Sequence, residues 1–104
     1  MAGKSDQYKR VNLTAVTAYS DSGSDIAFDG PMHSFLFSNR HSTAYIFISW
    51  KQGGEDAIAL APGQSVVHNG RPMTAHLSAR RDSAAAVGDV FLDICASGIG
   101  EFHT

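Results

Sequence analysis

Apolar and polar residues alternate along most of the chain after residue 10, in short stretches that turn-forming residues separate. This period of two predicts β-strands that bury one face and expose the other. Val11, Leu13 and Ala15, for example, share one face of the first expected strand. The expected strands cover residues 10–19, 25–29, 32–37, 43–50, 56–60, 64–68, 73–80 and 87–96.

Turn signals divide these strands and complete the expected fold. Gly30-Pro31 is expected to end the second strand, Ala61-Pro62-Gly63 is typical of a type II turn, and Asn69-Gly70 is typical of a hairpin. The one helix-compatible stretch, residues 84–86, is too short to form a stable helix in water. The pattern therefore predicts an all-β fold: an antiparallel β-sandwich of about eight strands, jelly-roll-like.

The length of 104 residues fits a single domain. Residues 1–9 are polar and show no periodicity, which predicts a flexible N-terminal arm. The sandwich is expected over residues 10–97, and residues 98–104 are expected to form a C-terminal tail.

Charge is sparse and unevenly distributed. Charged residues make up 17% of the chain, against about 25% in typical domains, so much of the surface is neutral and easily buried against a partner. A soluble monomer is the alternative reading of this composition. Residues 1–10 carry a net charge of +2, which leaves −4 for the rest. Such an arm can dock on the acidic body of a neighbouring copy. The overall charge of −2 predicts no nucleic-acid partner.

The single cysteine and the apolar runs bear on the compartment. Cys95 lies in the apolar run 90–95, which predicts a buried, unreactive thiol. The first residues lack an apolar signal region, and no stretch approaches about 18 apolar residues. We therefore expect synthesis in the cytoplasm and no membrane partner.

The sequence offers no catalytic or metal-binding motif. The histidines at 33, 41, 68, 76 and 103 are scattered and form no closely spaced ligand pair. No Gly-x-Ser-x-Gly motif is present, and the acidic residues lie mostly in expected turns, where solvated charge is the ordinary role. We predict a protein that is not an enzyme, with no catalytic residues, metal or cofactor. An enzyme would require a His/Asp site that only folding could assemble.

Aromatic residues near the middle of the chain allow a second function. Trp50, Tyr45 and Phe47 could form a platform on which sugar rings stack, although core packing is the favoured role for Phe47. The alternative function is therefore a monomeric carbohydrate- or ligand-binding β-sandwich module. The pair Arg80-Arg81 could contact a phosphate or an acidic neighbour.

Residues 32–96 carry a recognisable pattern. An asparagine, Asn39, follows an expected strand; then come AYIFISW at 44–50, AIALAPGQS at 57–65 and the aliphatic strand DVFLDICA at 89–96. This pattern resembles small β-sandwich virion proteins of tailed bacteriophages, namely the decoration, collar and tail-associated subunits.

The resemblance implies a self-assembling structural subunit of a phage virion, of the decoration, cement or collar type, at the capsid surface or the head–tail region. The implied partners are other copies of the chain and other virion proteins, such as capsid or tail subunits, and the implied location is the virion. An N-terminal arm would reach across to a neighbouring subunit. The expected assembly residues are Lys4, Tyr8, Lys9, Arg10, Trp50, Arg80, Arg81 and Phe102.

Overall fold

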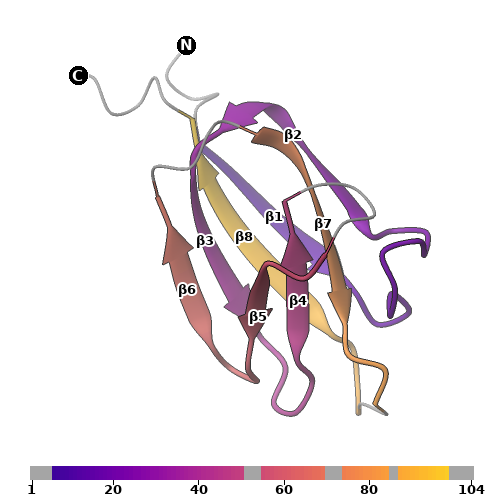
Figure 1. Cartoon of the computed structure of the whole chain (residues 1–104). Helices are drawn as coiled ribbons and strands as arrows, with labels where there is room; N and C mark the ends of the chain where they lie inside the picture. Colours follow the sequence, from indigo (N-terminus) through magenta and orange to yellow (C-terminus); the bar gives the residue numbers. More distant parts are fainter. Residues whose placement is uncertain (1–5, 51–54, 70–73, 85–86, 99–104) are drawn as a thin grey trace.

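The computed structural model describes residues 6–50, 55–69, 74–84 and 87–98. All regular structure within these ranges is β-strand, and the strands form two four-stranded antiparallel sheets (Figure 1). The strands are β1 (Asp6–Asn12), β2 (Asp25–Met32), β3 (Ser34–Asn39), β4 (Ile46–Ser49), β5 (Ile58–Leu60), β6 (Ser65–His68), β7 (Thr74–Arg81) and β8 (Phe91–Ser97). The predicted all-β sandwich of eight strands is confirmed.

The strand order is that of a jelly roll. Sheet A has the order β1-β8-β3-β6, and sheet B has the order β2-β7-β4-β5. Strand β1 pairs with β8, β2 with β7, β3 with β6 and β4 with β5, so the first half of the chain runs beside the second half in reverse. Such a long hairpin, rolled up so that successive pairs alternate between two sheets, gives the double Greek key of a jelly roll.

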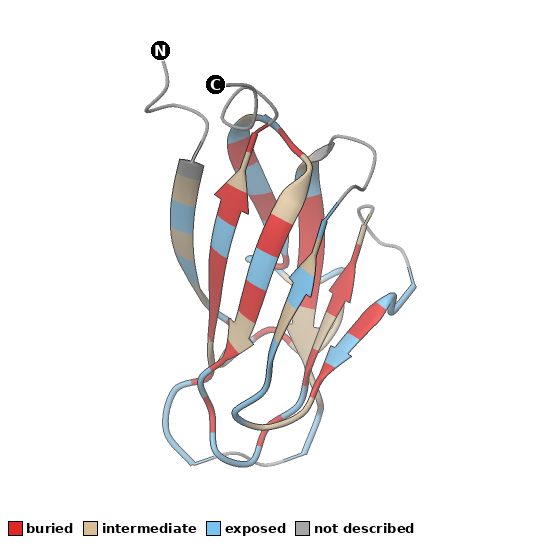
Figure 2. Cartoon of the chain, turned by 90° about the vertical axis from the view of Figure 1, so that its left-hand side faces the viewer, coloured by how far each residue is buried: buried red, intermediate tan, exposed pale blue. Residues whose placement is uncertain are grey.

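The core lies between the two sheets. Buried and exposed positions alternate along the strands, as Figure 2 shows, because successive side chains point to opposite faces. Aromatic rings form the centre of the core: the Phe35 ring stacks on Phe37 at 5.5 Å between centroids and lies 5.5 Å from Trp50. Phe28 of β2 lies 5.7 Å from Phe35 and so joins the two sheets.

A buried asparagine organises the connection from β3 to β4. Asn39 is 1% exposed, and its Nδ2 donates to the backbone oxygens of Ala44 and Ala61, at 2.7 and 3.1 Å, with the Leu60 oxygen 3.2 Å away. Its Oδ1 accepts the backbone N–H of His41 at 3.0 Å. The side chain thus satisfies backbone groups that no strand pairs, which explains an asparagine in this buried position.

The first strand differs from the prediction. It covers Asp6–Asn12 and not residues 10–19, because the chain turns at Asn12, whose Oδ1 accepts the backbone N–H of Thr14 at 2.9 Å. Leu13 and Val16 lie in the following loop and are buried, so the apolar pattern continues where the strand has ended. Residues 6–9 of the expected arm therefore belong to β1 and pair with β8, and residues 1–5 lie outside the described ranges.

The second strand also departs from the prediction. Gly30-Pro31 does not end it, since β2 continues to Met32 with an irregular pairing to β7 between Ala27 and Met32. Proline is tolerated because β2 is an edge strand, where one N–H faces away from the ladder. Gly30 has a φ of 115°, a value that side-chain-bearing residues rarely adopt.

Candidate interaction surfaces

The outer face of sheet A carries an apolar row across all four of its strands. Tyr8 of β1 lies opposite Cys95 of β8, Cys95 lies opposite Leu36 of β3, and Leu36 lies opposite Val67 of β6. We call these four residues the apolar row. Side chains in register on one face of a sheet are direct neighbours, so the row is a continuous strip.

This strip is open to solvent. Tyr8 is 59% exposed, Leu36 38% and Val67 61%, and Cys95 is exposed as well. The prediction of a buried thiol at Cys95 is therefore wrong: in β8 it is Leu92, Ile94 and Ala96 that point into the core, and Cys95 takes the opposite face. A shallow hollow of about 260 Å³ opens beside Leu36, Val67 and Cys95.

A carboxylate cluster lies next to the apolar row. Asp93 of β8 is opposite Arg10 of β1, whose Nε and Nη2 donate to the two carboxylate oxygens at 2.8 and 3.2 Å. The Tyr8 hydroxyl donates to Asp93 at 3.0 Å, and Arg40 Nε lies 3.2 Å from Oδ2. These groups cover Asp93, which is only 8% exposed although it belongs to the outer face.

The pairing shifts the titration of both partners. Hydrogen bonds from Arg10 are the main reason why the pKa of Asp93 lies below its ordinary value, and burial opposes this effect. The same carboxylate raises the pKa of Arg10. Arg10 was predicted to contact a neighbouring subunit, and within this chain it pairs with Asp93.

The outer face of sheet B has a different cluster. Arg80 of β7 pairs with Asp56 at 2.7 Å, and its guanidinium carbon lies 4.4 Å from the centre of the Phe47 ring. The Tyr19 hydroxyl donates to the same Asp56 carboxylate. Arg80 is the main cause of the lowered pKa of Asp56, whereas burial is the main cause of the raised pKa of Tyr19. The arginine thus covers the aromatic ring of this face.

The other expected assembly residues have separate locations. Arg81 donates from Nε to the Thr14 oxygen at 2.8 Å and from Nη1 to the Ala84 oxygen at 2.8 Å, and so it ties two loops together. Lys9 points to the inner side of β1, with its Nζ 5.9 Å from the centre of the Phe28 ring. Lys4 and Phe102 lie outside the described ranges.

The three aromatic residues of the sugar platform do not share a face. Trp50 packs against the core beside Phe35 and Phe37, and its ring meets that of His68 at 5.5 Å. Phe47 was expected in the core, but it lies on the outer face of sheet B beneath Arg80, since Ile46 and Ile48 take the inward positions. Tyr45 shares that outer face and is 45% exposed.

The histidines are also dispersed. His41 is 7% exposed and serves the backbone: its Nδ1 accepts the N–H groups of Thr43 and Ala44, and its Nε2 donates to the Val87 oxygen at 2.7 Å. In the described part of the chain, no three His, Cys, Asp or Glu side chains come together as a metal-binding group. His103 lies outside that part.

Sequence reasoning missed Leu36, Val67 and Cys95. A signal existed for the first two, because Phe35-Leu36-Phe37 and Val66-Val67 place apolar residues at successive positions of short strands. One residue of each such run must face outward. The pattern does not say which one, since that depends on which face of the sheet meets the core.

Comparison of the chain with protein-family models, with curated proteins and with solved structures gives no match. Among the described residues, no helix is long and apolar enough to span a membrane.

Proposed function

We propose that the protein is a non-enzymatic structural subunit that associates with further copies of itself through the outer face of sheet A. The apolar row is the observation that carries this proposal. Contiguous apolar side chains on the surface of a soluble domain are costly to leave in water, and they commonly mark an interaction site. Here they cross the full width of the sheet, from Tyr8 to Val67.

The second copy is the occupant that best fits this face. A two-fold axis that runs along the row places apolar row on apolar row. On one side of the row lie Arg10 and Asp93, and on the other side lie Ser34 and Asn69. The same rotation places the first side of one copy over the second side of the other copy. Arginines of the two copies then do not face each other. Two sheets stacked in this way lie about 10 Å apart, so the Cys95 side chains approach across the axis.

The finer role that we propose is that of a phage virion subunit, of the decoration, cement or collar type, with capsid or tail subunits as further partners. The resemblance of residues 32–96 to small virion proteins supports it, and so does the jelly-roll order, which is common in viral capsid domains. Co-sedimentation of the protein with purified particles is the expected result. Its complete absence from particles would overturn the virion role and leave self-association to be judged separately.

Light scattering coupled to size exclusion tests the self-association. The wild-type chain is expected to elute at a multiple of 11.1 kDa, and the double variant Leu36→Lys, Val67→Lys is expected at 11.1 kDa. Val87→Lys is the matched control, since Val87 is 90% exposed but lies in the loop before β8. A short bis-maleimide should link two copies through Cys95, and Cys95→Ser should remove that product. A wild-type chain that stays at 11.1 kDa at high concentration would sink the proposal.

A further inference from the structure

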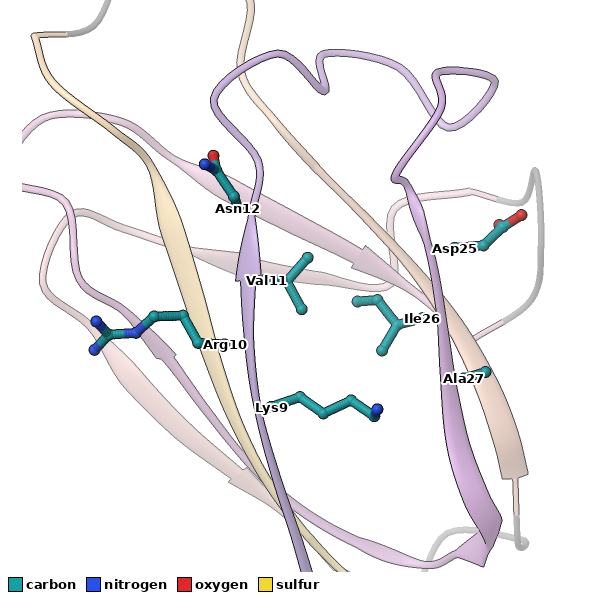
Figure 3. A pocket seen from close by; sticks show the side chains of 7 residues that line it. All are labelled: Lys9, Arg10, Val11, Asn12, Asp25, Ile26 and Ala27. Carbon is teal, nitrogen blue, oxygen red and sulfur yellow. The ribbon is translucent and has the colours of Figure 1, made fainter.

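A groove opens on the side of the sandwich where the two sheets part. Strand β1 is the edge of sheet A and β2 is the edge of sheet B, and between them lies a space of about 390 Å³. This volume is within the range of ligand pockets, about 300–1,000 Å³. Figure 3 shows Val11 and Ile26 pointing toward each other across the groove, and Lys9 reaching from β1 toward β2.

The groove is bordered by edge strands of the two sheets. The backbone N–H of Leu13 donates to the Val90 oxygen at 2.7 Å, which fixes the alternation of the ladder between β1 and β8. Backbone groups alternate in direction along a strand, so those of Val11 and Lys9, two and four residues before Leu13, also face β8. Those of Arg10 and Asn12 therefore face away from β8, toward the groove, which both residues line.

The same argument applies to the opposite side. The N–H of Ala79 donates to the Ser24 oxygen at 3.0 Å, so the backbone groups of Ile26 face β7. Those of Asp25 and Ala27 face the groove. Among the described residues, no strand pairs with β1 or β2 on this side, so an extended chain placed here would meet a strand edge on each side, as in strand addition to a sheet edge.

Two side-chain donors on the inner side of β1, one of which lines the groove, have no acceptor among the described residues. Gln7 and Lys9 lie two residues apart on the inner side of β1. The Gln7 Oε1 accepts the backbone N–H of Asp29 at 2.9 Å, but its Nε2 is buried without a hydrogen-bond partner in the described part of the chain. The Lys9 ammonium contacts the Phe28 ring and forms no ion pair with any described carboxylate. The Gln7 Nε2 is a buried donor without an acceptor, which is costly, and Lys9 is a half-buried cation, so a carboxylate here would be favourable.

We propose that this groove binds an extended, acidic peptide segment of a partner protein, which adds to β1 as an extra edge strand. Its inward side chains alternate with outward ones. One inward residue is Glu or Asp, which meets Lys9 and Gln7. Another, two residues along, is aliphatic and packs on Val11 and Ile26.

Lys9 gives this edge its selectivity. An inward charge on an edge strand opposes pairing with a neutral or basic strand, because the ammonium would be covered without compensation. A strand with a carboxylate at the matching position removes that cost. The site is separate from the apolar row, because Lys9 and Val11 point to the inner side of β1 whereas Tyr8 points outward.

The test uses capped synthetic peptides and amide shifts of the isotope-labelled full chain. The probe is Thr-Val-Thr-Glu-Thr-Val-Thr, whose Val and Glu side chains all fall on one face of a strand. We expect saturable shifts of the Arg10, Asn12 and Ala27 amides. Replacement of the Glu by Lys, or N-methylation of the peptide on the edge that meets β1, should weaken binding about tenfold or more.

A variant of the groove provides the second arm. Lys9→Met keeps the aliphatic stem beside Phe28 and removes the charge, so it should weaken binding of the Glu peptide about tenfold. It should also bind the Glu peptide and a peptide with Gln in place of the Glu equally well. Arg80→Met, which removes a cation from the outer face of sheet B, is the control and should bind as the wild type does. Equal binding of the Glu and Lys peptides, or no shifts at the highest soluble concentration, would overturn the proposal. Groove shifts that grow with protein concentration alone would mean that a second copy fills the site, which also overturns it.

Discussion

The outer faces of the two sheets differ in how far their apolar side chains are covered by other residues of the chain. On sheet B, Arg80 lies over the Phe47 ring and holds Asp56, so the aromatic surface is covered from within the chain. On sheet A, Arg10 holds Asp93 and lies over the Phe91 ring, 5.3 Å from its centre, but Tyr8, Leu36 and Val67 stay exposed. Both faces contain an arginine–carboxylate pair. Among the described residues, the face of sheet A has exposed apolar side chains in register across all four strands, and this strip gains from burial against another molecule.

The carboxylates of the two clusters should differ in their effect on folding. Asp93→Ala removes a carboxylate that is 8% exposed, accepts hydrogen bonds from Tyr8 and Arg10 and pairs with Arg40, so we expect a loss of about 1–3 kcal/mol in the free energy of unfolding. The Asp56 side chain is 38% exposed and screened by solvent, so Asp56→Ala should cost less than about 1 kcal/mol. Urea unfolding of both variants measures the difference. Equal losses would show that the two pairs are equivalent.

Acid should reduce the contribution of both clusters. The pKa values of Asp93 and Asp56 are lowered in the folded chain, so their stabilising effect is complete above the unfolded carboxyl pKa of about 4 and disappears as the pH falls through the folded values. The stability difference between wild type and Asp93→Asn should therefore shrink from neutral pH to strong acid. Unfolding curves at a series of pH values test this. A difference that stays constant with pH would contradict the assignment of Asp93 as an ionised partner.

An effect about as small as that of Asp56→Ala should come from replacing Arg80, which would expose apolar side chains on the outer face of sheet B. Arg80→Met removes the cation above Phe47 and should cost about 0.5–1 kcal/mol, the usual size of a cation–π contact at such a site. It also uncovers the Phe47 and Tyr19 rings. When Arg80→Met is added to the Leu36→Lys, Val67→Lys variant, which is expected to be a monomer, we therefore expect weak new self-association by sedimentation velocity. No change in sedimentation would mean that Arg80 does not prevent association through the outer face of sheet B.

The alternation of apolar and polar residues was enough to predict an all-β sandwich and seven of the eight strands within a few residues of their ends. It succeeded because a strand that packs against a core on one side must repeat every two residues. The first strand was misplaced, since Leu13 and Val16 bury apolar side chains from a loop and imitate a strand. An alternating pattern indicates which side chains are buried, and side chains of loop residues can be buried as well.

The sequence contained the residues of the candidate surfaces, but it did not show which of them lie side by side. Tyr8, Cys95, Leu36 and Val67 come from four segments, and they become one row only through the register of β1, β8, β3 and β6. The same holds for Arg10 and Asp93, which are 83 residues apart in the chain. The sequence by itself determined the period, the turns and thus the class of fold. The pairing of distant strands decided which side chains meet, because contacts across a sheet depend on register and not on proximity along the chain.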